Sequence, residues 1–439
     1  MGLKIEYTDK PVTPFGGMIL MKELIERCKL RDQLQNLNLP ESTSNNSIPT
    51  IDIVESFLVS VWIGASAFAQ TAIVKLDSTL CEMFGWKRVP SGTTFGRFFK
   101  KFSHKENNRV FPELNKWFFN QIKFKNYTLD VDSSVITRHG NQEGSHKGYN
   151  PSKRGRPSHH PLFAFVSELR MVANCWLRSG DTASASSCLE FLQETFDLMK
   201  DKTIGLFRAD SGFCSNTIFN YLEDENRSVP YVIAARMHTI LQQHVKDVKN
   251  WIALDKGIWI AEIEYKAAKW TKARRVIIIR QSIELRPNAT GKKLKLFNDD
   301  MFYQNYRYHG FITNQNLPAV QIWEQYKGRA DAENRIQELK YDFALEGFVM
   351  KNFFATEAAM RMGVLAYNLM SLYRQVALQT SVQPRLQTLR INCFAVGSWI
   401  VKRGNDRILK MSVRIEKRSW MDGLFSKIQQ AQVPLSLKT

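Results

Sequence analysis

The sequence predicts an α/β protein: a mixed sheet with helices packed on it, followed by a β-rich passage and flanked by mainly helical segments. Three observations predict this class. Residues 127–235 alternate between strand-like and helix-like patterns. Residues 251–313 contain the strand-like runs IAEIEY, RRVIIIR and FYQNYRYHGFIT. Residues 1–125 and 318–378 read mainly as helices.

The amino-terminal region predicts a helical bundle. Residues 51–76 form an apolar helix, and residues 90–94 supply a capping start for a second helix, TTFGRFFKKF. The phenylalanines of this helix predict packing inside a bundle, whereas its cations predict a surface that lies on DNA. Both can hold on opposite faces of the helix. The cations are Arg97, Lys100 and Lys101.

The central region begins with YTLDVDSSVI, in which Leu129 and Val131 alternate with Asp130 and Asp132. This alternation predicts a strand with one apolar face. The elements that follow are expected in the order strand, strand, helix, strand, helix, strand, over residues 161–166, 169–177, 181–199, 203–209, 215–223 and 231–235.

The last third of the chain returns to helices. Pro318 opens a long helix, and residues 353–378 form one more apolar helix. The tail at residues 402–418 carries seven basic residues against two acidic ones. This tail is expected to hold DNA or a second subunit, and the sequence leaves both open.

Composition favours a nucleic-acid partner. The 439 residues include 61 Lys and Arg against 42 Asp and Glu, a net charge of +19, which suits a polyanion. The longest apolar run, residues 56–69, is shorter than the roughly 20 residues of a membrane span. The six cysteines form no C-x-x-C pair and predict neither a zinc site nor disulfides. We therefore expect a cytoplasmic protein without a membrane segment.

Four residues of the long helix have a regular spacing. Tyr326, Arg329, Glu333 and Lys340 stand at offsets 0, 3, 7 and 14, which at about 100° per residue fall in one narrow stripe. Cations in a row suit phosphates, and an acid among them suits a metal ion. A solvated face on which Arg329 pairs with Glu333 is the alternative.

Two predicted strands each end in an acid: Asp132 precedes Ser133-Ser134, and Asp210 lies in RADSGF. With Glu333 these acids predict an oxygen-only site for Mg²⁺ or Mn²⁺, in which two ions about 3.5–4 Å apart act on a phosphodiester. Each Asp alone is more often a turn former or helix cap. Asp130 shares a face with Asp132, so the first ligand stays open, with Asp132 preferred.

Together these residues resemble the DDE transposases of bacterial insertion sequences, in the group that carries Y-(2)-R-(3)-E-(6)-K. The four spaced residues match that pattern without a gap. LDVDSSV resembles the strand of the family's first acid, and RADSGF that of the second. The resemblance covers about residues 127–376. It implies an RNase H-like sheet, with the β-rich passage as the group's insertion before the Glu helix.

The chain is expected to divide into five segments, and the resemblance implies a role for each matching residue. The three acids are implied to be catalytic and to bind two metal ions: Asp132, Asp210 and Glu333. The phosphates near the transposon end are implied to be gripped by Tyr326, Arg329 and Lys340. The segments are residues 1–125 for DNA-end binding and dimerisation, 126–237 and 316–378 for the catalytic core, 238–315 for the insertion, and 379–439 for a basic carboxyl-terminal region.

Two further DNA contacts are expected. Similar enzymes cut through a hairpin and receive a flipped-out base on an aromatic of the insertion. Trp251, Trp259 and Trp270 are available, and Trp270 is the first choice because basic residues surround it; packing in the insertion's core is the alternative. Arg154 and Arg156, in RGRP, resemble a minor-groove hook, with a solvated loop as the default.

The function expected from this resemblance is cut-and-paste transposition by a homodimer on double-stranded DNA, which binds the terminal inverted repeats and then target DNA. Two alternatives remain. One is a metal nuclease of the same fold that joins nothing. The other is a catalytically silent DNA-binding protein derived from a transposase.

Overall fold

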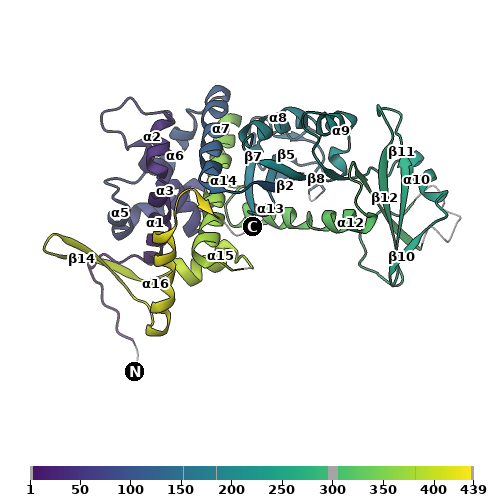
Figure 1. Cartoon of the computed structure of the whole chain (residues 1–439). Coiled ribbons are helices and arrows are strands. Elements are labelled where there is room, and N and C mark those ends of the chain that lie inside the picture. Colours follow the sequence, from purple (N-terminus) through teal and green to yellow (C-terminus); the bar gives the residue numbers. More distant parts are fainter. Residues whose placement is uncertain (1–2, 152, 184, 295–304, 381, 437–439) are drawn as a thin grey trace. The chain divides into compact units, whose positions relative to one another are not determined.

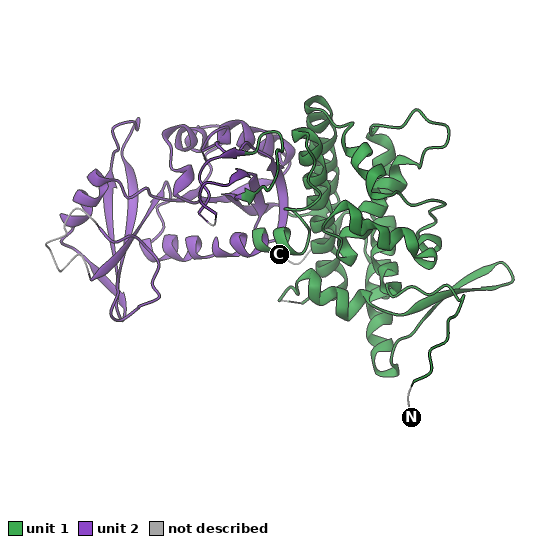
Figure 2. Cartoon of the chain, turned by 180° about the vertical axis from the view of Figure 1, so that it is seen from behind, with its two compact units in different colours: residues 1–124, 136–145, 336–439 green, residues 125–135, 146–335 purple. Residues whose placement is uncertain are grey.

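The computed structural model describes residues 3–436 apart from 152, 184, 295–304 and 381. The chain divides into two compact units, and each collects segments that are distant in the sequence (Figure 2). Unit 1 comprises residues 1–124, 136–145 and 336–439, and unit 2 comprises residues 125–135 and 146–335.

Unit 2 is built on a nine-stranded mixed sheet in the order β10-β11-β12-β13-β9-β8-β2-β6-β7. The strands β2, β8 and β9 are parallel to one another, and every other neighbouring pair is antiparallel. The strands are β2 (Asn126–Ser133), β6 (Leu162–Val166), β7 (Met171–Trp176), β8 (Thr203–Ala209), β9 (Tyr231–Ala234), β10 (Ile252–Asp255), β11 (Ile258–Tyr265), β12 (Arg274–Ser282) and β13 (Tyr306–Thr313).

The predicted α/β class with a mixed sheet is confirmed, but the β-rich passage is not a separate sheet. Phe311, Ile312 and Thr313 of β13 pair with β9, so β10 to β13 continue the central sheet. Central strands such as β6 are buried along their whole length, as their apolar sequences require. Residues 302–304 of the expected strand FYQNYRYHGFIT lie outside the described residues.

Helices cover both faces of this sheet. The helices α8 (Cys188–Leu198) and α9 (Asn216–Glu223) lie on one side, and α12 (Ala319–Lys327) lies on the other (Figure 1). Ile322 of α12 is buried in an apolar cluster with residues of β8, β9 and β11 to β13. The helix predicted from Asp181 begins later, at Cys188.

The other short elements of unit 2 are β4 (His146–Lys147), β5 (Pro157–His159), η3 (Ser211–Phe213) and α10 (Thr239–Lys246). β4 and β5 pair antiparallel, with His146 opposite Ser158. Residues up to Arg335 of α13 (Ala330–Tyr341) also belong to this unit.

Unit 1 is mainly helical. Its elements before residue 140 are η1 (Gly16–Met18), α1 (Ile19–Arg27), α2 (Leu30–Asn36), α3 (Thr50–Ile63), η2 (Phe68–Thr71), α4 (Ala72–Leu76), α5 (Ser78–Phe84), α6 (Gly92–Phe99), α7 (His104–Asn120), β1 (Ile122–Lys123) and β3 (Ile136–Thr137). After α13 come α14 (Phe353–Tyr373), η4 (Arg374–Leu378), α15 (Leu386–Leu389), η5 (Arg390–Phe394), β14 (Ser398–Arg403), β15 (Asp406–Met411), α16 (Ile415–Gln430) and β16 (Leu435–Ser436).

The core of unit 1 joins the two ends of the chain. Nearly all of α14 is buried, and the Trp62 indole of α3 donates to the Ala366 carbonyl of α14 at 3.0 Å. The apolar stretch predicted as one helix over residues 51–76 is divided, because α3 ends at Gly64, whose φ of +116° favours glycine. The basic tail predicted at residues 402–418 includes most of the β14–β15 hairpin.

No single helix among the described residues has both the length and the apolar character that a membrane span needs. The segments Thr50–Ile63 and Phe68–Leu76 meet the test only as a pair, with a bend of 102° between them.

Candidate active site

Two acids stand side by side at the carboxyl ends of the parallel strands β2 and β8. Val131 of β2 pairs with Ala209 of β8, so Asp132 takes the next position on β2 and Asp210 directly follows β8. Because parallel neighbours run in the same direction, their carboxyl ends meet at one edge of the paired strands. Both acids are therefore brought to one place by the strand register.

Local hydrogen bonds orient each carboxylate. Asp132 is 7% exposed, and its Oδ1 accepts the Ser133 backbone N–H at 2.8 Å. Asp210 caps the short helix η3, where its Oδ1 accepts the Gly212 N–H at 2.8 Å. Asp210 thus also has the role of helix cap, which the sequence offers as the alternative for an Asp at a strand end.

The long helix predicted after Pro318 is two helices. α12 ends at Lys327, α13 begins at Ala330, and Gly328 and Arg329 form the turn between them. Within this turn the Arg329 N–H donates to the Tyr326 carbonyl at 3.0 Å. The turn therefore tightens the chain between Tyr326 and Arg329, where the sequence predicts uninterrupted helix.

Arg329 joins two of the three acids. Its Nη2 lies 2.9 Å from Asp132 Oδ2, and its Nη1 lies 3.3 Å from Glu333 Oε1. Arg329 is 5% exposed, whereas the side chain of Glu333 is 65% exposed. The Arg329 Nε is buried without a hydrogen-bond partner among the described residues. The i,i+4 pair predicted for Arg329 and Glu333 exists, together with a second pair to β2.

Five titratable groups influence one another here. Burial raises the pKa of Asp132 to about 7; Arg329 opposes this shift, and the charges of Asp210 and Glu333 add to it. Burial also raises the pKa of Tyr326 to about 12, with the same acids contributing. Burial disfavours the charge of Arg329, but Asp132 and its neighbours hold the pKa of Arg329 above its ordinary value. The structure thus brings Asp132, Asp210, Tyr326, Arg329 and Glu333 together.

Tyr326 is also part of the apolar packing under α12. Its ring centroid lies 4.5 Å from that of Phe311 on β13. This contact holds the aromatic ring against the sheet and fixes the position of the helix end that carries Arg329.

Asp130, the alternative first ligand, is fully buried and engaged elsewhere. Its two carboxylate oxygens accept hydrogen bonds from Nε and Nη2 of Arg208 at 2.6 and 2.8 Å. Asp130 is therefore paired with Arg208 within the sheet, whereas Asp132 lies level with Asp210 at the strand ends, so the geometry favours Asp132 over Asp130 as the candidate first ligand.

The other basic residues expected at DNA lie in different surroundings. Lys340, in unit 1, forms an ion pair with Glu346 at 3.4 Å. Arg154 and Arg156 are exposed in the turn between β4 and β5, where Gly155 has a φ of +76°. Both arginines, which belong to unit 2, are therefore accessible to a polyanion.

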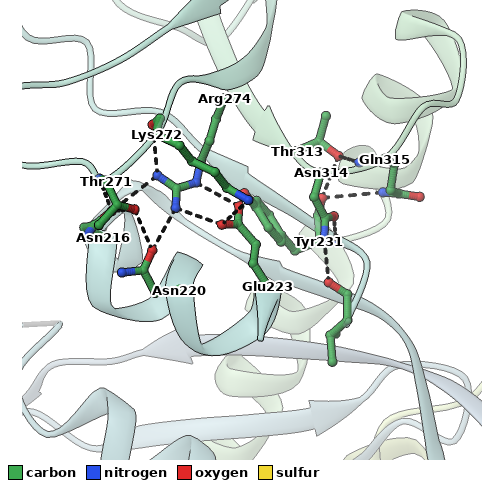
Figure 3. A network of polar contacts seen from close by, with 11 residues as sticks. Asn216, Asn220, Glu223, Tyr231, Thr271, Lys272, Arg274, Thr313, Asn314 and Gln315 are labelled. Carbon is green, nitrogen blue, oxygen red and sulfur yellow. Dashed lines mark hydrogen bonds and ion pairs between the residues drawn. The ribbon is translucent and has the colours of Figure 1, made fainter. Parts of the chain in front are cut away.

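Trp270 packs at the junction of the insertion strands with α9. Its ring meets Phe219 and Tyr265 edge-on at 5.2 and 5.5 Å between centroids. Beside it, the Arg274 guanidinium donates twice to Glu223 at 2.8 Å (Figure 3). Trp270 is half-buried and has the packing role that was its alternative, while part of its surface remains exposed.

Trp251 and Trp259 line a separate pocket of about 340 Å³. The Arg280 guanidinium lies over both rings, 4.3 and 4.8 Å from their centroids. The pocket also contains two lysines, so aromatic faces and positive charge occur together. The remaining lining residues are Val245, Lys246, Val248, Lys249 and Tyr308.

The carboxylate oxygens of the candidate site are ligands that a hard divalent cation prefers. In this structure the guanidinium of Arg329 contacts two of the three carboxylates. In the described part of the chain, no three His, Cys, Asp or Glu side chains are arranged to hold a metal ion. At this site the guanidinium lies between Asp132 and Glu333. The three carboxylates offer only oxygen, and their mutual repulsion contributes to the raised pKa of Asp132. A cation of higher charge would relieve that repulsion.

Neither the role of Arg208 nor the pocket at Trp251 is predicted from the sequence. A signal for Arg208 exists: Asp130 and Arg208 each stand two positions before a candidate catalytic acid, so both pairs share a sheet face. No comparable sequence signal connects Trp251 and Trp259 with Arg280. Trp259 comes to lie opposite Arg280 only through the register of β11 and β12.

Comparisons with known proteins identify a family and solved structures that are similar to the chain. The model of the family described as transposase DDE domain group 1 matches residues 3–433. No curated protein matches the chain. A cryo-EM structure of a piggyBac transposase synaptic complex with hairpin DNA is similar at 10% identity and a TM-score of 0.47, covering 86% of this chain and 78% of that one.

Proposed function

The chain belongs to the transposase DDE domain group 1 family, and from this membership we propose that it is a cut-and-paste DNA transposase of a bacterial insertion sequence. It binds terminal inverted repeats, cleaves the strands at their ends and joins the freed 3′-hydroxyls to target DNA. The observation that carries the proposal is the grouping of three acids, Tyr326 and Arg329 at the ends of two parallel strands.

The three acids are the proposed catalytic residues and metal ligands. DDE transposase domains generally use divalent metal ions, and we assign two Mg²⁺ ions, with Mn²⁺ as a substitute, to Asp132, Asp210 and Glu333. When bound by these acids, such ions would activate the attacking oxygen and stabilise the leaving oxygen of a phosphodiester. The burial of Asp132 and the hydrogen bonds from Ser133 and Gly212 hold the carboxylates in fixed orientations before DNA arrives.

The remaining residues of the pattern bind the DNA backbone in this proposal. Arg329 exchanges its carboxylate partners for a phosphate. Tyr326 donates a hydrogen bond to a phosphate through its hydroxyl group, which stays protonated at neutral pH because its pKa is about 12. Lys340, Arg154 and Arg156 provide further cations for phosphates. The net charge of +19 supports a polyanionic partner.

A base of the transposon end is proposed to stack on an aromatic residue of the insertion. Trp270 keeps part of its surface exposed, and the pocket of Trp251 and Trp259 offers a second platform beside Arg280. Fluorescence of 2-aminopurine in the end sequence separates them, since stacking on an aromatic ring quenches it. The variant that abolishes quenching, Trp270→Ala or Trp251→Ala, identifies the platform.

We further assign a homodimer in the cytoplasm that holds two ends of the element. Size-exclusion chromatography with light scattering, with and without end DNA, tests this assembly. A complex with one protein chain and one DNA end would contradict it.

An excision assay tests the function. The gene's flanking DNA is cloned around a marker, and wild type is compared with Asp132→Asn, Asp210→Asn and Glu333→Gln in Mg²⁺. Glu324→Gln is the matched control, because Glu324 is an exposed acid on the adjacent helix α12 and forms an ion pair with Lys327. We expect wild type and control to release the marker and the three other variants to bind DNA without cutting.

Three outcomes would replace the proposal. Binding without cutting by wild type, also in Mn²⁺, would indicate a silent DNA-binding protein. Cutting without joining to target DNA would indicate a metal nuclease. Cutting by Glu333→Gln would show that a different residue is the third acid.

A further inference from the structure

A buried ion pair lies directly beneath the candidate catalytic acids. Asp130 of β2 and Arg208 of β8 are opposite each other in the parallel register and are 0% and 6% exposed. Side chains two positions apart on a strand share a face. Asp130 therefore shares a sheet face with Asp132, and Arg208 lies opposite Asp130, two positions before Asp210, which directly follows β8.

The guanidinium of Arg208 also reaches helix α12. Its Nη1 donates to the Gln325 carbonyl at 2.5 Å, one of the last-turn carbonyls that a helix leaves without an internal partner. Its Nη2 donates to Ser167 Oγ at 3.0 Å. One side chain thus connects β2, β8, the turn after β6 and the end of α12.

Gly328 makes this approach possible. A Cβ at Gly328 would lie 2.4 Å from Arg208 Nη1, a distance that would force the guanidinium away. The backbone of Gly328 is right-handed helical, with φ −60° and ψ −17°. A side chain at this position would therefore conflict with the Arg208 contact and not with the backbone conformation.

We propose that Asp130 and Arg208 are positioning residues that fix the α12–α13 turn against the two catalytic strands. The pair sets the distance from Asp132 and Asp210 to Tyr326 and Arg329 before DNA or metal binds. This inference rests on the proposed function, because it assigns the pair to that same site. The positioning role explains the hydrogen bond from Arg208 to the Gln325 carbonyl, which an apolar pair of equal volume could not make.

If the Asp130–Arg208 pair only stabilised the fold, apolar residues could replace it without an effect on α12. Well-packed apolar residues often replace a buried ion pair without loss of stability. The double variant Asp130→Leu/Arg208→Met should therefore fold while losing every polar connection to α12. The matched control is Glu357→Leu/Arg361→Met, which replaces a pair in α14 whose side chains are 7% and 5% exposed.

The first measurement is amide hydrogen exchange of the full chain without metal or DNA. We expect the peptide covering residues 319–333 to exchange at least about tenfold faster in Asp130→Leu/Arg208→Met, since local opening governs exchange. Other peptides of unit 2 and the same peptide in the control should keep the wild-type rate. Unchanged exchange at residues 319–333 would overturn the proposal.

The second measurement separates rate from binding in end cleavage. Misplacement by about 1 Å can reduce a catalysed rate about 100-fold, so we expect a fall of that order in the cleavage rate with an end-DNA Kd within about threefold of wild type. Arg208→Lys should restore part of the rate, because it keeps the charge beside Asp130. Wild-type cleavage by the double variant would also overturn the proposal.

Gly328→Ala gives an independent test that leaves both charges in place. It should raise exchange at residues 319–333 and slow cleavage in the same direction, so it remains informative if the double variant does not fold. A wild-type protein that never cuts would remove the proposed function, whereas the exchange measurements would still decide whether the pair holds α12.

Discussion

At the scale of the residue, the candidate site balances negative charge with a single guanidinium. Arg329 contacts Asp132 and Glu333, and burial, with a smaller contribution from Asp210 and Glu333, raises the pKa of Asp132. The site is therefore strained electrostatically until a stronger cation or a phosphate redistributes these contacts. Two predictions follow from this balance, one about ion affinity and one about stability.

The variant Arg329→Gln should bind Mn²⁺ at least about tenfold more tightly than wild type in the absence of DNA, because unit charges in contact near a protein surface interact by about 4 kcal/mol. Isothermal titration calorimetry measures the affinity. The control Lys327→Gln removes a more exposed cation of the same helix region and should change the affinity by less than about twofold. Weaker binding by Arg329→Gln would show that Arg329 assists the ion and does not compete with it.

Asp132 should reduce stability at neutral pH. Its pKa rises from 3.8 to about 7 on folding, so below the lower value both states hold the proton. Between the two values only the unfolded state releases it, and the free energy of unfolding falls as pH rises through this window. Asp132→Asn removes this effect and should raise the Tm at pH 8 but not at pH 3.5.

Thermal denaturation in chelator, at both pH values, measures this difference. Asp197→Asn, on α8, serves as the control for loss of a carboxylate. A lower Tm for Asp132→Asn at pH 8 would show that the Arg329 contact outweighs the cost of burial.

At the scale of the element, α6 has the buried aromatic face that the sequence predicts, and the contact of its cations with DNA stays a prediction. Phe95, Phe98 and Phe99 are buried, whereas Arg97 and Lys100 are exposed. Ser91 caps the helix through its side chain at 3.3 Å from the Thr94 N–H, as its position before the helix predicts. The aromatic face belongs to the core of unit 1, and the cationic face is available to DNA.

The two faces of α6 should separate by mutation. Phe99→Ala should lower the free energy of unfolding by about 3–5 kcal/mol because it leaves a cavity. Arg97→Ala/Lys100→Ala should leave the Tm unchanged and reduce the slope of log K against log salt by about 2, one for each lost phosphate contact. An unchanged slope in fluorescence anisotropy would remove α6 from the DNA interface.

Elements with a strong local pattern were predictable, and the breaks within them were not. The alternation in β2 and the capping of α6 by Ser91 and of α9 by Ser215 depend on residues that are neighbours in the sequence. The turn at Gly328 and Arg329 depends on Arg208, which is more than a hundred positions away in the sequence. The Asp130–Arg208 pair likewise joins residues 78 positions apart. Helix propensity and spacing contain no information about such partners.

At the scale of the whole molecule, both units are discontinuous. Unit 1 needs residues 1–124 together with residues 336–439, and unit 2 is inserted between them. The hydrogen bond from Trp62 to Ala366 and the burial of α14 show that neither end forms this core alone. The predicted segment 1–125 therefore describes a stretch of sequence and not the whole of a helical core.

A fragment of residues 1–125 should not unfold cooperatively, because it lacks α14 and exposes the apolar surface that α14 covers. Circular dichroism during heating measures this, with the full chain as the control. A sigmoidal transition in the fragment, with a Tm close to that of the full chain, would show that the amino-terminal helices are an independent domain.

The discontinuity of unit 1 also fixes the timing of maturation during translation. The sheet of unit 2 is complete in sequence once residue 335 has left the ribosome, whereas unit 1 waits for α14 and the residues after it. A nascent chain therefore displays the cations of α6 before the core beneath them exists.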